Sequence, residues 1–222
     1  MIPLKDDNPR SSVPIITIGL IVVNVLVFLY ELSLGPRIEF FIQEYAAIPA
    51  KIVRGRELET LVTSMFLHGG FFHVGSNMLY FWIFGDNVEH YLGHFRFIYF
   101  YLICGLFAAI THIFLGGISE VPMIGASGAI SGVLGAYLVK YPRAQVLVLI
   151  PIFWFITIRK IPALFVLGLW FAMQLLSGVF SGLSSTGLEK GGIAFWAHVG
   201  GFVAGMILIN IFKRKRRVEW HF

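Results

Sequence analysis

The chain has 222 residues, of which 57% are hydrophobic, 16% aromatic and only 13% charged, and its formal net charge is +5. Soluble globular proteins carry about 25% charged residues, so this composition excludes an ordinary soluble domain, and the mean hydropathy of +0.81 agrees. The length suits one compact membrane domain without a second large one. Because the basic residues lie between apolar stretches and near the C-terminal end, we expect them to set membrane topology rather than bind nucleic acid.

Charged residues divide the chain into long uncharged stretches, and these are 11–30, 60–85, 97–119, 121–139, 144–158, 161–188 and 191–212. A transmembrane helix needs about 20 mostly apolar residues. Six of the seven stretches reach or nearly reach that length, whereas 144–158 has only 15 residues and contains Pro151. We therefore predict an all-α membrane protein, a six-transmembrane-helix bundle in which 144–158 is an interfacial or re-entrant segment.

The remaining segments define the expected domain limits. Residues 1–12 are predicted to be a short cytoplasmic N-terminus with no cytosolic domain, and no cleavable signal peptide is evident. Residues 13–212 form the membrane domain, and 213–222 form a basic cytoplasmic tail. Within the membrane domain, the segment 36–60 mixes aromatic and charged side chains, so we expect a structured first loop that lies in the outer membrane interface.

Six spans place both termini on the same side of the membrane. That side would hold 12 of the 17 Lys and Arg residues, including the basic cluster at 213–217. The other side would hold the remaining five, which are Arg37, Lys51, Arg54, Arg56 and Lys190. The positive-inside rule then predicts cytoplasmic termini. We expect an integral multi-pass protein of the plasma or inner membrane.

This topology brings four polar residues to a similar depth in the outer half of the bilayer. His73 and Asn77 lie early in the second span, Ser127 opens the fourth, and His198 lies near the start of the sixth. Intramembrane polar groups are costly, so a functional site is their default interpretation. A serine beside a histidine that can take its proton is the pair needed for nucleophilic acyl transfer. The spans carry no acidic residue at this depth, which predicts a serine–histidine dyad.

Further features of these spans agree with a shared site. His73 and Asn77 are four residues apart, so on a helix they share a face and could donate hydrogen bonds to an oxyanion. The Ser127 N–H, at a helix N-terminus, would add a third donor. His68 is expected to help hold the loop or His73. Small residues at four-residue spacing predict close contact of the fourth and sixth spans. The fourth span has one row of Ser127, Ser131 and Gly135 and another of Gly128 and Gly132, and the sixth span has Gly201 and Gly205.

Four short motifs resemble the rhomboid family of intramembrane serine proteases, and they are HVGSN at 73–77, VEHYLG at 88–93, GASG at 125–128 and AHVGG at 197–201. The resemblance implies that Ser127 is the nucleophile and that His198 is the general base and then the acid. It further implies an oxyanion hole made by His73, Asn77 and the Ser127 N–H. The expected substrates are single-span membrane proteins, cut near the outer face of the bilayer. No cofactor and no metal are implied.

The chain departs from the family pattern at two places. Well-known bacterial members carry a Trp-Arg pair in the first loop, where this chain has RGR at 54–56. They also carry a tyrosine one turn after the serine, which stacks on the catalytic histidine. Here that position is Ser131, so the sequence leaves the orientation of His198 unexplained. The aromatic fifth span, which includes Trp170, is a candidate substrate gate by family likeness only.

Three other interpretations compete with a protease. The first is a catalytically inactive rhomboid-like protein that binds membrane clients, although such proteins usually lack one member of the pair. The second is a metal site built from His68, His73, His90 and His94, but His90 and His94 are expected near the opposite membrane face. The third is a transporter, but the spans lack the intramembrane charge expected for coupling.

Overall fold

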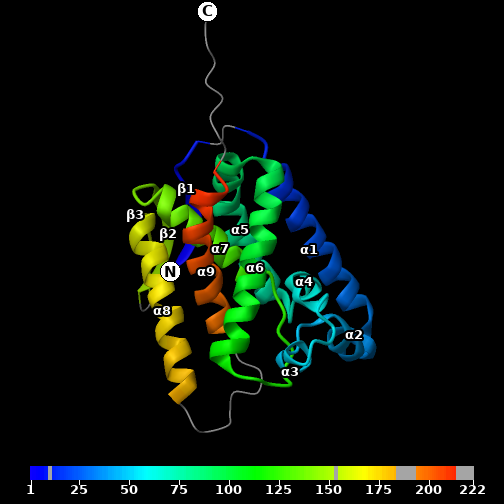
Figure 1. Cartoon of the computed structure of the whole chain (residues 1–222). Coiled ribbons are helices and arrows are strands. Elements are labelled where there is room, and N and C mark those ends of the chain that lie inside the picture. The colour runs from blue at the N-terminus through cyan, green and yellow to red at the C-terminus, as the bar shows by residue number, and fades with distance from the viewer. Residues whose placement is uncertain (10–11, 153–154, 184–193, 214–222) are drawn as a thin grey trace, which may run out of the picture.

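The fold is mostly helical, and a bundle of long helices makes up most of it (Figure 1). The computed structural model describes residues 1–9, 12–152, 155–183 and 194–213. Within these ranges the six longest helices are α1 Ile15–Ser33, α5 Phe71–Leu92, α6 His94–Gly116, α7 Ser127–Lys140, α8 Ala163–Leu183 and α9 Phe195–Ile211. The start of α1 and the end of α9 lie at the same end of the bundle (Figure 1).

Three helices in the described ranges are long and apolar enough to cross a membrane. They are Ile15–Ser33, His94–Gly116 and Ala163–Phe180, and Phe195–Ile211 is a shorter apolar helix. The six-span count therefore stays a prediction. Lys190 and most of the predicted basic tail, residues 214–222, lie outside the described residues.

The predicted first loop, 36–60, folds into short helical segments, and these are the 3-10 helix η1 Gly35–Arg37, α2 Ile38–Tyr45 and α3 Pro49–Val53. The beginning of the predicted stretch 60–85 forms α4 Thr60–Thr63 and the 3-10 helix η2 Ser64–Phe66, before α5 starts at Phe71. Ala47 joins this segment to the loop before α7, because it exchanges backbone hydrogen bonds with Met123 at 3.2 and 2.8 Å. Ala46, Ala47 and Ile48 are buried at this junction. The position of the segment relative to a membrane surface stays a prediction.

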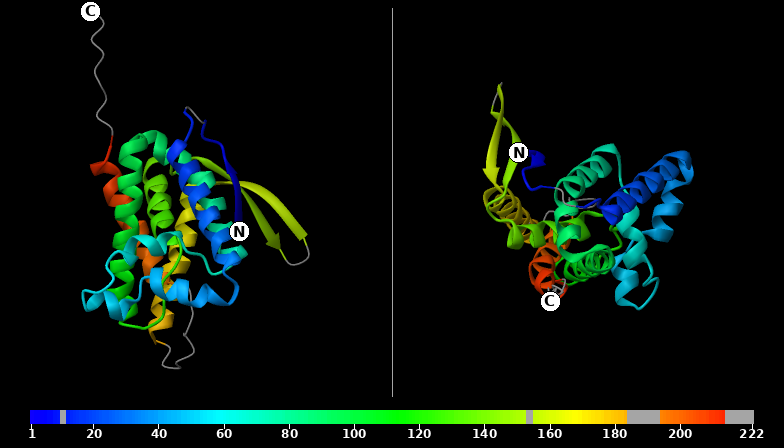
Figure 2. Two further views of the ribbon diagram at one scale, coloured as in Figure 1. Left: turned by 90° about the vertical axis from the view of Figure 1, so that its right-hand side faces the viewer. Right: turned by 90° about the horizontal axis from the view of Figure 1, so that it is seen from above.

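The all-α prediction is wrong in one respect, because the chain also forms an antiparallel three-stranded sheet beside the bundle (Figure 2). Its strands are β1 Ile2–Asp6, β2 Gln145–Ile152 and β3 Phe155–Pro162, in the order β1-β2-β3. Val146 and Val148 are fully buried at alternate positions of β2, and β-branched residues at this period favour a strand. The described residues of the stretch 144–158 thus belong mainly to β2 and β3, and none of them is helical.

The N-terminal segment is structured rather than a simple tail. Asp6 at the end of β1 is buried and accepts hydrogen bonds from the Tyr137 hydroxyl at 2.6 Å and from the Asn87 side-chain nitrogen at 3.0 Å. Burial raises the pKa of the Asp6 carboxyl, and the Tyr137 hydrogen bond opposes that shift. These contacts attach β1 to α5 and α7.

A buried carboxylate joins α5 to the start of α1. Glu89 is 1% exposed and accepts hydrogen bonds from the backbone N–H groups of Ile16 and Thr17 at 2.9 and 2.7 Å. The Thr17 hydroxyl donates another at 2.7 Å, and His94 Nδ1 lies 2.5 Å away. The first N–H groups of a helix have no intrahelical partner, so this carboxylate caps α1. Helix α5 itself continues to Leu92, beyond the end of the predicted stretch 60–85.

The backbones of α7 and α9 pack closely against each other, as the rows of small residues predicted. A Cβ atom added at Gly205 would lie 1.8 Å from the Gly132 carbonyl oxygen, and one at Gly201 would lie 2.0 Å from the Gly128 carbonyl oxygen. Such distances mean that the two helix backbones touch. Small residues permit this approach, which brings the start of α7 next to the start of α9.

We predict that Gly205→Ala destabilises the protein, because the added methyl group must displace a backbone carbonyl. Overpacking of this kind costs about 1–3 kcal/mol, and the temperature of thermal unfolding in detergent should fall. Gly19→Ala on α1 is the matched control, since a Cβ at Gly19 meets nothing within 4 Å. Equal unfolding temperatures for the two variants would contradict the close packing.

We also predict that Glu89→Gln lowers the free energy of unfolding by about 1–3 kcal/mol, because an amide nitrogen then faces N–H groups that lose their acceptor. The loss should appear in chemical denaturation in detergent. Glu39→Gln, at an exposed position of α2, is the control and should change nothing. A Glu89 variant as stable as that control would rule out the capping role.

Candidate active site

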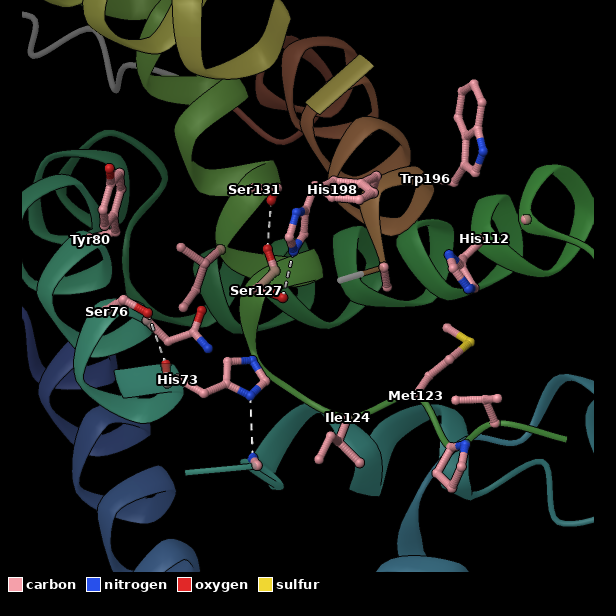
Figure 3. Close-up of a pocket in the computed structure, with 18 of the residues that line it drawn as sticks. His73, Ser76, Tyr80, His112, Met123, Ile124, Ser127, Ser131, Trp196 and His198 are labelled. Atoms are coloured by element: carbon pink, nitrogen blue, oxygen red, sulfur yellow. Dashed lines mark hydrogen bonds between the residues drawn. The ribbon is translucent and has the colours of Figure 1, made fainter. Parts of the chain in front are cut away.

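Ser127 and His198 form a hydrogen bond at the junction of α7 and α9. The Ser127 Oγ lies 2.8 Å from His198 Nε2 (Figure 3). Ser127 is the first residue of α7, and His198 lies in the first turn of α9 with 9% of its surface exposed. The structure thus brings together the two residues that the sequence singled out from stretches 70 residues apart.

The turn before α7 depends on Gly125. This residue has a φ of +121°, which side chains rarely adopt, and its N–H donates to the Ser64 carbonyl at 2.9 Å. A Cβ at Gly125 would lie 2.7 Å from His73 Nε2. Glycine is therefore required both for the turn and for the approach of His73. The helix that follows, α7, begins at Ser127 with N–H groups that lack intrahelical partners.

His73 and Asn77 come to the same place from α5. The Gly69 N–H donates to His73 Nδ1 at 3.2 Å, so the proton of a neutral ring lies on Nε2, which is the atom that faces Gly125. The Asn77 side-chain nitrogen is buried and has no hydrogen-bond partner among the described residues. His73 and Asn77 line the same cavity as Ser127, so both N–H donors belong to residues at the site of the serine.

All four residues line a single cavity of about 940 Å³ (Figure 3). Ligand pockets in proteins span about 300–1,000 Å³, so the space is large enough for a short peptide segment. Much of the lining is apolar or aromatic, including Phe72, Met123, Ile124, Trp170 and Trp196. The cavity thus combines apolar and aromatic side chains with polar ones, which include the four candidate residues.

Helix α8 supplies a contact to His198 that the sequence did not reveal. The His198 Nδ1 lies 2.7 Å from Gln174 Oε1, and the Trp170 ring centroid lies 5.8 Å from that of His198. Ser131 instead donates to the Ser127 carbonyl at 2.6 Å. The available signal was a polar amide in the uncharged stretch 161–188, four residues after Trp170.

His112, on α6, also lines the cavity, whereas His68, His90 and His94 lie near the two ends of α5. His68 packs against His73 with ring centroids 5.1 Å apart, and its backbone N–H donates to the Glu31 carboxylate at 3.2 Å. His68 therefore lies where it can hold the loop and His73. His90 and His94 lie at the other end of α5, where His90 contacts Ser12. Among the described residues, no group of three or more His, Cys, Asp or Glu could hold a metal ion.

Comparison with known proteins identifies the family. Residues 55–215 match the Rhomboid domain, and the chain belongs to the rhomboid family. It is 30% identical to "Rhomboid protein 1, mitochondrial" of Saccharomyces cerevisiae over 194 residues, which is 85% of this chain and 51% of that protein. It is 32% identical to "Rhomboid protease GluP" of Bacillus subtilis over 130 residues, 58% of this chain and 25% of that one.

A third relative is the human "Presenilin-associated rhomboid-like protein, mitochondrial", which is 31% identical over 142 residues, 62% of this chain and 36% of that protein. The chain spans about half the length, or less, of these relatives. Two of these three relatives are named as mitochondrial, so the comparisons do not support the plasma membrane predicted from the sequence.

Proposed function

We propose that this chain is an intramembrane serine endopeptidase with Ser127 as nucleophile and His198 as general base. The observation that carries the proposal is the 2.8 Å hydrogen bond between Ser127 Oγ and His198 Nε2 inside the cavity. A serine is a weak nucleophile until a base takes its proton, and this geometry fits that requirement. Membership of a family that includes a protein named as a protease supports the same conclusion.

The reaction follows from the positions of these two groups. Ser127 Oγ attacks the carbonyl carbon of the scissile amide while its proton passes to His198 Nε2. The tetrahedral intermediate collapses when His198 returns the proton to the leaving amine, which gives an acyl-enzyme ester at Ser127. His198 then takes a proton from water, which attacks the ester carbonyl carbon. The second tetrahedral intermediate collapses as His198 gives this proton to Ser127 Oγ, which releases the acid product and regenerates the enzyme.

The oxyanion of each tetrahedral intermediate needs fixed hydrogen-bond donors. The proposed donors are His73 Nε2–H, the Asn77 side-chain N–H and the Ser127 backbone N–H. Support comes from the side-chain nitrogen of Asn77, which is buried without a partner among the described residues, and from the His73 nitrogen that faces Gly125. Donors that are already oriented in an enclosed site usually supply a large share of the catalysis.

The proposed substrates are single-span membrane proteins that reach the cavity from the surrounding bilayer. The apolar lining of the cavity supports a hydrophobic peptide as the occupant. The catalytic domain comprises residues 13–212, with 1–12 and the tail 213–222 on the cytoplasmic side. Support for cytoplasmic termini comes from the excess of basic residues on that side, 12 against five, and from the shared end of α1 and α9 (Figure 1).

We predict that Ser127→Ala and His198→Ala each abolish cleavage of a model single-span substrate by the purified protein. A fluorophosphonate probe should label the wild type at Ser127 and leave Ser127→Ala unlabelled, because the probe needs the activated hydroxyl. Ser33→Ala, at the exposed end of α1, is the control and should retain both signals. A wild type that neither cleaves nor reacts would favour a catalytically inactive client-binding protein instead.

We predict that His73→Ala lowers kcat by about 10²–10³-fold, which is the usual cost of losing one oxyanion donor. Asn77→Ala should cost less than His73→Ala, since the remaining donors share the charge. His90→Ala is the matched control, because His90 lies at the opposite end of α5 and contacts Ser12. If both α5 variants keep the wild-type kcat, α5 takes no part in the chemistry.

A further inference from the structure

Helix α8 packs on α9 through positions that are one helical turn apart. Trp170 and Gln174 both contact His198, and Gly178 lies against the Trp196 ring, where an added Cβ would be 3.1 Å from the ring. Residues four apart share one face of a helix, so this face of α8 is the one turned toward the start of α9. The outward face is exposed and apolar, with Met173 among its residues.

We propose that Gln174 is a positioning residue, whose side-chain oxygen accepts a hydrogen bond from His198 Nδ1–H and holds the imidazole for proton transfer with Ser127. This role rests on the proposed protease function. It extends the serine–histidine pair to a line of three groups, Ser127, His198 and Gln174, supplied by α7, α9 and α8.

The first step of the argument concerns the proton on the ring. A neutral imidazole carries one N–H, and an amide oxygen can only accept a hydrogen bond. With Gln174 Oε1 at 2.7 Å, the proton of His198 belongs on Nδ1. The lone pair of Nε2 then faces the Ser127 hydroxyl at 2.8 Å, as a general base requires. The opposite tautomer would present an N–H to the serine and could not take its proton.

The second step concerns the orientation of the ring. Well-known family members carry a tyrosine at the α7 position of Ser131, and that ring stacks on the histidine. Ser131 has no ring, and its hydroxyl donates a hydrogen bond to the Ser127 carbonyl instead. Trp170 lies against His198 with an angle of 37° between the ring planes. Trp170 therefore limits the tilt of the imidazole, and the hydrogen bond to Gln174 fixes the rotation of the ring about its Cβ–Cγ bond. Both restraints come from α8.

The third step concerns the free-energy cost of placing the Gln174 amide in an apolar helix. A polar side chain in an uncharged membrane stretch is unfavourable unless it is hydrogen-bonded, and such groups are functional by default. Gln174 sits in the apolar stretch 161–188, and its oxygen is directed at the histidine of the site. The amide is neutral, so it orients the ring without adding a buried charge to an apolar helix.

The test compares Gln174→Met, which keeps the side-chain length and removes the acceptor, with Gln174→Glu, which restores an oxygen acceptor. Gln174→Met should lower kcat by about 10–100-fold, the range found for partners that orient metal-bound histidines, with KM nearly unchanged. Gln174→Glu should keep kcat within a few-fold of the wild type. Met173→Ala, on the outward face, is the control, and all variants should unfold at similar temperatures.

A spectroscopic measurement tests the proposal independently of cleavage. In ¹⁵N-histidine NMR, with the His198 signals assigned by comparison with His198→Ala, the wild type should be protonated at Nδ1 and unprotonated at Nε2. Gln174→Met should shift His198 toward a mixture of tautomers. A wild-type Nε2 that carries the proton would overturn the proposal, whether or not the protein cleaves substrate.

The two proposals fail in different ways. A wild type that shows no cleavage and no probe labelling would contradict the protease function, while the NMR measurement would still decide the role of Gln174. A Gln174→Met variant with wild-type kcat, in a protein that cleaves, would overturn the positioning role alone. A Gln174→Glu variant that loses as much kcat as Gln174→Met would overturn the assignment of the amide oxygen as the partner.

Discussion

The direct contact between the backbones of α7 and α9 is the constraint on which the site depends. Glycine pairs along the two helices leave no room for side chains, since a Cβ at Gly205 would lie 1.8 Å from the Gly132 carbonyl oxygen. Lipid tails are as apolar as the helices, so association in a bilayer relies on such close packing rather than on a hydrophobic driving force. The contact continues to the first turns of both helices, where Ser127 and His198 are 2.8 Å apart. A wider helix separation would move the hydroxyl and the imidazole out of hydrogen-bond reach.

The remaining elements are held relative to this pair by buried polar contacts at both ends of the bundle. At the site end, Gly125 donates to Ser64 and lies against His73, so the first loop, the turn before α7 and α5 are joined there. At the other end, Glu89 binds the first N–H groups of α1 and fixes that helix to α5. Unpaired backbone groups are costly where water is scarce, so these carboxylate contacts are strong local determinants of helix position. Helix α5 is thereby restrained at both ends, which fixes His73 beside the cavity.

The sequence predicted the parts of the structure that follow from local pattern, and it missed those that depend on distant partners. Ser127, His198, His73 and Asn77 stood out because they are polar residues in apolar stretches, and the structure gathers them around one cavity. The sheet was missed because β1 pairs with β2, more than a hundred residues further along the chain, and the apolar β2 also resembles a membrane segment. The contact that fixes the charged end of α5 was not foreseen, because Glu89 binds backbone groups of α1 that are about 70 residues away in the sequence. Gln174 was missed because α8 is apolar on every side, so its composition does not indicate which face meets α9.

The dependence of His198 on α8 links the position of a peripheral helix to the chemistry of the site. Helix α8 is largely exposed on its outer face, with Leu176 56% and Phe180 66% exposed, and its inner face meets α9 at the histidine itself. A hydrogen bond of 2.7 Å weakens steeply once its atoms separate beyond about 3.5 Å, so a shift of α8 by less than the width of an atom removes the Gln174 restraint. The backbone packing of α7 and α9 brings Ser127 and His198 within reach of each other, and this packing does not involve α8. The approach of the two residues and the orientation of the imidazole therefore depend on different helices, and the Ser127–His198 hydrogen bond requires both.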